Sequence, residues 1–203
     1  GDGSWAAAGG GTILDTSSNN LYTSQSGNSS GGSYNISLGN QAGDGLASGG
    51  NFNTLSGYQA GKGITTGDGN VAVGPYIMAG ESLTAVTGGY NVGIAHSALR
   101  NLTSGEHNIA IGYQAGQNVS TASQNISIGR DAGNDVTTGY ANVCVGGWAG
   151  QKITTSGNNT CLGGQAGREI TTGANNTCIG YNTGYDGTTD LTTGSNNILI
   201  GHG

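Results

Sequence analysis

The chain has 203 residues, of which 43 are glycine and one is proline, and charged residues make up only 8% of it. Globular domains usually carry about 25% charged residues, so the composition argues against an ordinary globular domain. Five basic against eleven acidic residues give a net charge of −6, which argues against nucleic acid as a partner. No apolar run approaches the roughly 18 residues of a membrane span, so we expect no membrane insertion.

The first part of the chain, residues 1–33, follows no repeat and ends in a stretch rich in serine and glycine. One apolar segment, Ile13-Leu14, interrupts it. Such a composition is typical of linkers. We therefore expect residues 1–33 to form an N-terminal connector or cap, and residues 34–203 to form a single repeat domain.

From residue 34 onward, an asparagine followed four residues later by glycine recurs along the chain. The clearest copies read NISLG, NVAVG, NIAIG, NISIG, NVCVG, NTCLG, NTCIG and NILIG, and two degenerate copies read NTLSG and NVGIA. Most successive copies begin 17 residues apart, and a period this short predicts stacked coils. The copies begin at Asn35, Asn53, Asn70, Asn91, Asn108, Asn125, Asn142, Asn159, Asn176 and Asn197.

Within one repeat, numbered from the asparagine as position one, aliphatic residues at positions two and four flank a small residue at position three. This alternation predicts a short strand, and the aliphatic-Thr-Thr segment near positions twelve to fourteen predicts a second one. Glycines at positions five, nine and fifteen fall where the chain must turn. The sequence thus predicts an all-β fold, a parallel β-solenoid of about ten 17-residue coils.

Stacked coils place equivalent residues about 4.8 Å apart, so ten coils give a rod on the order of 45–50 Å long. Identical side chains then form columns, and asparagine columns can pass amide hydrogen bonds from coil to coil. We predict such a structural ladder along the repeats that begin at Asn108, Asn125, Asn142, Asn159 and Asn176.

Positions one to five carry no charged residue in any of the ten repeats. We infer that both faces of the strand are covered, one by the thin interior of the coil and the position-three face by a neighbouring chain. The alternative is a monomer whose interior accepts only small residues at position three. The column that forms either a trimer interface or a core includes Ala72, Ala110, Ser127, Cys144, Cys161 and Cys178.

The three cysteines are 17 residues apart because the repeat is, and we interpret them as small apolar fillers of that column. Parallel Cβ vectors suit a disulfide poorly, and no further ligand recurs with the cysteines to complete a metal site. We expect neither a metal nor another cofactor.

Two repeats are four residues longer and contain residues 74–89 and 182–194, which we expect to project as loops. Aromatic residues gather near position six, directly after the strand. They can stack on the sugar rings of a cell-surface glycan or pack against another chain, or they are merely solvated turn residues. The candidate binding residues are Tyr58, Tyr76, Tyr113, Trp148, Tyr181 and Tyr185.

The signature TTGxxNxxIGxxAG, repeated over about residues 34–203, resembles repeats of bacteriophage tail fibres. It is also similar to the shorter Asn-x-x-x-Ile-Gly repeat in the head domains of trimeric autotransporter adhesins. The resemblance implies three chains around a common axis, a place in the virion beside other fibre proteins, and attachment to a host surface. The 17-residue period departs from the adhesin repeat, so the handedness of the coil does not carry over.

The function that we predict is therefore a homotrimeric, non-enzymatic segment of a phage tail fibre that supports or contributes to attachment to a host receptor. One alternative is a repeat domain of an adhesin on the bacterial surface. A polysaccharide-cleaving tailspike would need two carboxylates about 5–10 Å apart, for which Asp131, Asp135 and Glu169 are the acidic candidates. An ice-binding solenoid would need two outward threonine columns, and the adjacent threonines leave one.

Overall fold

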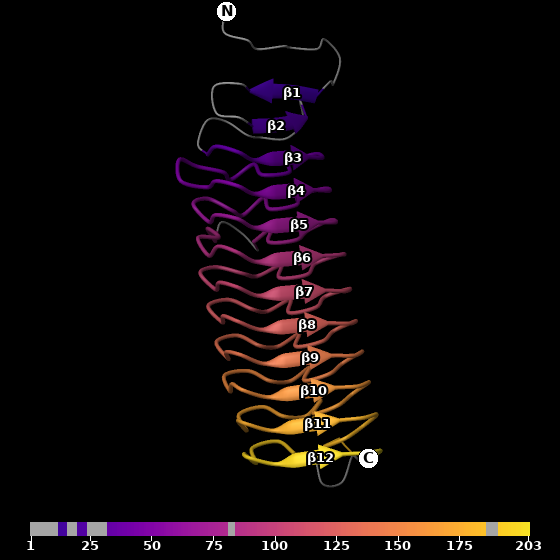
Figure 1. Cartoon of the computed structure of the whole chain (residues 1–203). Helices are drawn as coiled ribbons and strands as arrows, with labels where there is room; N and C mark the ends of the chain where they lie inside the picture. Colours follow the sequence, from indigo (N-terminus) through magenta and orange to yellow (C-terminus); the bar gives the residue numbers. More distant parts are fainter. Residues whose placement is uncertain (1–11, 16–19, 24–31, 81–83, 186–190) are drawn as a thin grey trace, which may run out of the picture.

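The computed structural model of the chain describes residues 12–15, 20–23, 32–80, 84–185 and 191–203, and Figure 1 shows it as an elongated stack of coils. All of its strands belong to one sheet, ordered β1 to β12 as in the sequence. The strands are β1 (Thr12–Asp15), β2 (Asn20–Thr23), β3 (Ile36–Leu38), β4 (Thr54–Ser56), β5 (Val71–Val73), β6 (Val92–Ile94), β7 (Ile109–Ile111), β8 (Ile126–Ile128), β9 (Val143–Val145), β10 (Thr160–Leu162), β11 (Thr177–Ile179) and β12 (Ile198–Ile200).

Each strand from β2 onward pairs in parallel with the next, and equivalent repeat positions are in register. Cys161, for example, pairs with Cys144 on one side and with Cys178 on the other. The chain loops back between successive strands, so one coil adds one strand to the sheet (Figure 1). The predicted all-β solenoid of about ten coils is confirmed. Its two longer coils keep this register, because β5 pairs with β6 and β11 with β12 without a shift.

The sheet begins earlier in the chain than the predicted boundary at residue 34. β1 pairs antiparallel with β2, and β2 pairs in parallel with β3. The backbone N–H of Asn35 donates to the side-chain Oδ1 of Asn20 at 2.7 Å, so Asn20 occupies the asparagine position one strand earlier. Sequence analysis missed it because Asn20 precedes Asn35 by only 15 residues and no glycine follows it four residues later. Residues 1–11, 16–19 and 24–31 of the predicted connector lie outside the part of the chain that the structure describes.

In the coils that the structure describes, the second predicted strand does not form. Around position thirteen, three successive N–H groups of Thr137, Thr138 and Gly139 all donate to the carbonyl of Thr154 in the next coil. An extended strand spreads its hydrogen bonds over alternate residues, so this convergence of donors bends the chain into a corner. A single parallel bridge, between Ile64 and Val86, is the nearest approach to a second strand in the described coils.

The core is a narrow seam inside the coil, built from positions three, eight and twelve. At position three the side chains of Ala72, Ala110 and Cys144 are almost fully buried, as are their counterparts in the other central coils. Alanine fills position eight, for instance Ala149, and a larger aliphatic such as Ile153 fills position twelve. The inference that the position-three column faces a neighbouring chain is therefore wrong. A three-residue strand has two faces, and here its middle residue points inward while positions two and four point outward.

Positions three and nine of a coil share the same space in the seam. A larger side chain at one of them therefore goes with a small residue at the other. Gly150, at position nine, adopts a φ of +54°, and a methyl group on it would lie 2.4 Å from the Sγ of Cys144. In the coil that begins at Asn91, the fourth counted from Asn35, the sizes are reversed, because Leu99 occupies position nine and Gly93 position three. Close packing of this kind leaves no room for large side chains at both position three and position nine of one coil.

The repeated asparagines form one continuous hydrogen-bonded ladder inside the rod. The backbone N–H and the side-chain Nδ2 of Asn142 both donate to Oδ1 of Asn125, at 3.0 and 3.1 Å. Nδ2 of Asn142 also donates to the carbonyl of Ser156 in its own coil, at 2.9 Å. Asn159 repeats this arrangement on Asn142. Each central asparagine thereby satisfies both amide hydrogens and both acceptor sites of its side chain.

The backbone link of this ladder, from one asparagine N–H to the preceding Oδ1, runs without interruption from Asn20 to Asn197. The asparagines from Asn20 to Asn176 are at most 2% exposed. Buried polar groups need partners because leaving them unpaired is costly. The ladder therefore fixes both the burial of position one and the vertical register of the coils.

Replacing Asn142 by alanine should destabilise the rod strongly, because it leaves Oδ1 of Asn125 short of a donor and both donors of Asn159 without their acceptor. At about 1–3 kcal/mol for each unpaired buried group, we expect a loss of about 3–6 kcal/mol, measured by urea unfolding followed by circular dichroism. Asn158→Ala is the matched control, because Asn158 is exposed and its position holds Ala141 in the preceding coil. A loss in N142A no larger than in N158A would contradict the ladder's role.

Replacing Gly150 by alanine should cost more than replacing Gly116, although both glycines have a φ of +54°. A methyl group on Gly116 lies no closer than 3.3 Å to any neighbour, whereas one on Gly150 meets the Cys144 sulfur. Overpacking typically costs about 1–3 kcal/mol. We expect this excess in G150A, and we expect the second change Cys144→Ala to remove part of it, because Cδ1 of Ile153 still lies 2.8 Å from the added methyl group. Equal losses in G150A and G116A would refute the proposed exchange of volume between positions three and nine.

Candidate functional site

The candidate binding residues lie at one corner of the coil, directly after the strand. Glycine at position five turns the chain with a φ near +130°, as at Gly112. Position seven then takes a positive φ, as at Gln114 and Trp148. This pair of turns directs position six outward, and Tyr58, Tyr113 and Tyr181 are exposed there.

Three of the six predicted residues form one continuous column of rings. Tyr58 meets Tyr76 edge to face with ring centroids 5.3 Å apart, and Tyr76 lies 5.4 Å from His96. His96 stacks on Tyr113 at 5.4 Å with an interplanar angle of 26°. The rings come from four successive coils. His96 completes the column and was not among the predicted site residues, although its position in the repeat identifies it.

The other three predicted residues lie outside this column, because Gly147 and Gly164 interrupt position six. The guanidinium of Arg130 lies 4.8 Å from the Trp148 ring centroid. Tyr181 lies 5.5 Å from His202, which sequence analysis also missed. Tyr185 lies beneath Arg168 at 5.2 Å. The six residues therefore do not form one continuous surface.

The stacking changes what this corner can offer a ligand. Because His96 stacks on Tyr113, one face of the tyrosine ring is already covered by the neighbouring coil. Aromatic pairs of this kind contribute about 0.5–1.5 kcal/mol beyond burial, so the column also stabilises the stacking of coils. What it presents outward is dominated by ring edges and phenolic hydroxyls.

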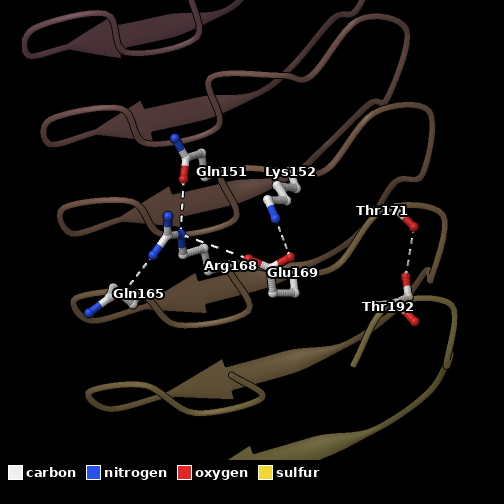
Figure 2. A network of polar contacts seen from close by, with 7 residues as sticks. All are labelled: Gln151, Lys152, Gln165, Arg168, Glu169, Thr171 and Thr192. Atoms are coloured by element: carbon white, nitrogen blue, oxygen red, sulfur yellow. Dashed lines mark hydrogen bonds and ion pairs between the residues drawn. The ribbon is translucent and has the colours of Figure 1, made fainter. Parts of the chain in front are cut away.

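A polar network next to Tyr181 and Tyr185 joins two coils, and Figure 2 shows its members. Nζ of Lys152 contacts Oε2 of Glu169 in the next coil. Nε of Arg168 donates to Oε1 of Gln151 at 3.0 Å, and its NH1 donates to Oε1 of Gln165 at 2.9 Å. The contact of Arg168 with Gln165 lies within one coil, and the other two contacts join residues of adjacent coils. The network therefore holds the two coils together.

The acidic residues that a tailspike enzyme would require are all engaged by partners. Glu169 lies between Lys152 and Arg168. Asp131 is 3.2 Å from Nε of Arg130, and Asp135 accepts a hydrogen bond from Asn118 at 3.2 Å. Each carboxylate is thus held by a cation or an amide, an arrangement that suits stabilisation of stacked coils.

The two threonines of each coil have different roles. At position thirteen the hydroxyls of Thr137 and Thr154 donate to carbonyls of the following coil, at 3.2 Å in each case. At position fourteen Thr138 and Thr155 are exposed. Only the second column presents free hydroxyls to solvent, so the coil offers half of the array that an ice-binding face would need.

The three cysteines are buried free thiols that line the core of adjacent coils. Hydrogen bonding to Cys144 and burial raise the pKa of the Cys161 thiol. Hydrogen bonding to Cys161 and burial likewise raise the pKa of Cys178. A thiol with a raised pKa stays protonated and is a poor nucleophile. Among the described residues, no group of three or more His, Cys, Asp or Glu side chains is placed to hold a metal ion.

Comparison of the chain with protein-family models, with curated proteins and with solved structures gave no match. A search of the described residues for membrane-spanning helices found none long and apolar enough.

Raising the pH above about 8.5, the pKa of a thiol in an unfolded chain, should destabilise the rod through Cys161 and Cys178. The raised pKa values keep both thiols protonated in the folded state, while the unfolded chain ionises and so binds fewer protons. Stability is therefore complete below that pH and falls above it, by about 2 kcal/mol per thiol at pH 10.

Urea unfolding at pH 7 and pH 10 tests this expectation, with the double variant Cys161→Ala/Cys178→Ala as the control. Alanine occupies the same position at Ala72 and Ala110, so the variant keeps a native-like core. Tyrosine and lysine titrate in both proteins, and only the difference between them reports the thiols. An equal pH dependence in the two proteins would contradict the assignment.

Proposed function

We propose that the chain is a rigid structural segment of a phage tail fibre. In this role three copies assemble beside other fibre proteins of the virion, and the rod supports or contributes to attachment to a host receptor. The proposed role is structural rather than enzymatic. The observation that carries it is the uninterrupted asparagine ladder from Asn20 to Asn197, because such a ladder suits a part that must hold its length.

Several lines of hydrogen bonds run along the rod at different points of the coil. The strands form one line, and the buried asparagines form a second. The corner near position thirteen forms a third, for example from the N–H of Thr154 to the carbonyl of Thr171. A fourth joins position seven to position six, as from Gln114 to His96. Bending the rod in any direction stretches at least one of these lines, which supports a role that needs stiffness.

The repeat domain of a bacterial surface adhesin would also need to be stiff. The exposed aromatic column of Tyr58, Tyr76, His96 and Tyr113 supports a contribution to attachment in either setting. Tyrosine is enriched at recognition surfaces because it combines an apolar ring with a polar hydroxyl. A cell-surface glycan fits this chemistry, with weak contacts multiplied by the number of copies.

Electron microscopy with a gold-labelled antibody raised against the 203-residue chain tests the proposal. We expect label on filaments that project from intact virions, and no label after the antibody has been absorbed with the purified chain. Label on bacterial envelopes would replace the virion by the adhesin alternative. Label confined to the cell interior would overturn both.

A further inference from the structure

The outward side of the sheet is an uncharged strip that runs the length of the rod. It consists of the first and last residues of β3 to β12, here called the strand face. Sixteen of these twenty residues are Ile, Val or Leu, and the other four are Thr or Ser. Those in the central strands are partly exposed, and Val73 reaches 40%. Monomeric proteins rarely expose a continuous apolar strip of this length.

The charged residues of the described coils lie elsewhere on the rod. Lys152, Arg168 and Glu169 occupy the polar network, Arg130 and Asp131 follow the strand, and the remaining charges lie in the loops. A solvated strand face would be expected to collect charges, as half-exposed strands do. The absence of charged residues from all twenty positions of the strand face indicates that this surface is covered in the assembled protein.

The spacing of the strand face identifies what covers it. In-register pairing repeats its ridges about every 4.8 Å. A helix repeats about every 5.4 Å, so it loses register with these ridges within a few turns. A second copy of the chain has the same spacing and matches every ridge, as paired sheets do in dry cross-β interfaces.

We propose that the strand face packs against the strand face of a second copy of this chain, side by side and in parallel register. In that register the hydroxyl-bearing coils, at Thr54 with Ser56, at Thr160 and at Thr177, meet their own counterparts. Aliphatic residues then meet aliphatic residues along the rest of the rod.

The dimensions agree with such a contact. Ten coils of about 4.8 Å and three-residue strands of about 10 Å give on the order of 450 Å² for each face. Two faces bury on the order of 900 Å², which is the size of a weak, reversible interface rather than of a permanent one. The proposal goes beyond the proposed fibre and does not rest on its three copies, because a face-to-face contact joins two copies and self-association through this face needs no virion.

The experiment compares two charge pairs placed on the same two coils of the full chain. Ile128→Glu with Val145→Glu puts charges on the strand face, and Thr138→Glu with Thr155→Glu puts them on the exposed threonine column. Light scattering at micromolar concentration should give a multiple of 19.9 kDa for the unmodified chain and for the threonine pair. It should give a single chain for the strand-face pair, with an unchanged circular dichroism spectrum. A monomeric unmodified chain, or a strand-face pair that remains associated, overturns the proposal.

Cross-linking keeps the proposal testable if the strand-face pair fails to fold. The natural cysteines are buried, so a cysteine introduced at Ile128 is the accessible thiol, and Thr138→Cys is its control. With a bifunctional maleimide long enough to span the ~10 Å between packed sheets, Ile128→Cys should give two linked chains, and Thr138→Cys should not. The absence of a linked dimer in Ile128→Cys, or equal linking in both variants, contradicts the parallel strand-face contact. Both outcomes are independent of where the antibody binds in the virion experiment.

Discussion

The rod depends on one constraint: each central coil buries an asparagine side chain that must find four hydrogen-bond partners in a fixed place. The preceding coil supplies the acceptor, the following coil supplies two donors, and a carbonyl of the same coil receives the remaining amide hydrogen. A coil displaced along the rod would leave these groups unpaired in an apolar interior. The two longer coils obey the constraint, because Asn91 and Asn197 still bond to the asparagine of the preceding coil.

The interior that surrounds the ladder is so narrow that a large side chain at position three or at position nine requires a small one at the other. Where cysteine fills position three, glycine is needed at position nine, as in Cys144 with Gly150 and Cys161 with Gly167. Where Leu99 fills position nine, Gly93 lies at position three. The high glycine content therefore has two causes. Some glycines are required by the turns of the backbone, and others by the space left beside a neighbouring side chain.

The period, the strand and the asparagine column could be predicted from the sequence because all three recur with the same spacing. The side of the strand that faces inward could not, since small residues at position three suit either a thin core or a close contact between chains. Burial of Ala110 and Cys144 decides this. The second strand was predicted from the Thr-Thr propensity, which the convergence of N–H groups on Thr154 overrides. Among the site residues, Tyr58 and Tyr113 share position six of the repeat, so the sequence alone places them in one column. The contact of Trp148 with Arg130 depends on side-chain conformations, which the spacing of residues does not reveal.

The asparagine ladder also has a direction. Every link runs from an N–H of the later coil to an oxygen of the earlier one. A segment that leaves the ribosome thus meets an acceptor already presented by the segment synthesised before it. Assembly can follow synthesis, one turn at a time, with each completed turn acting as the template for its successor.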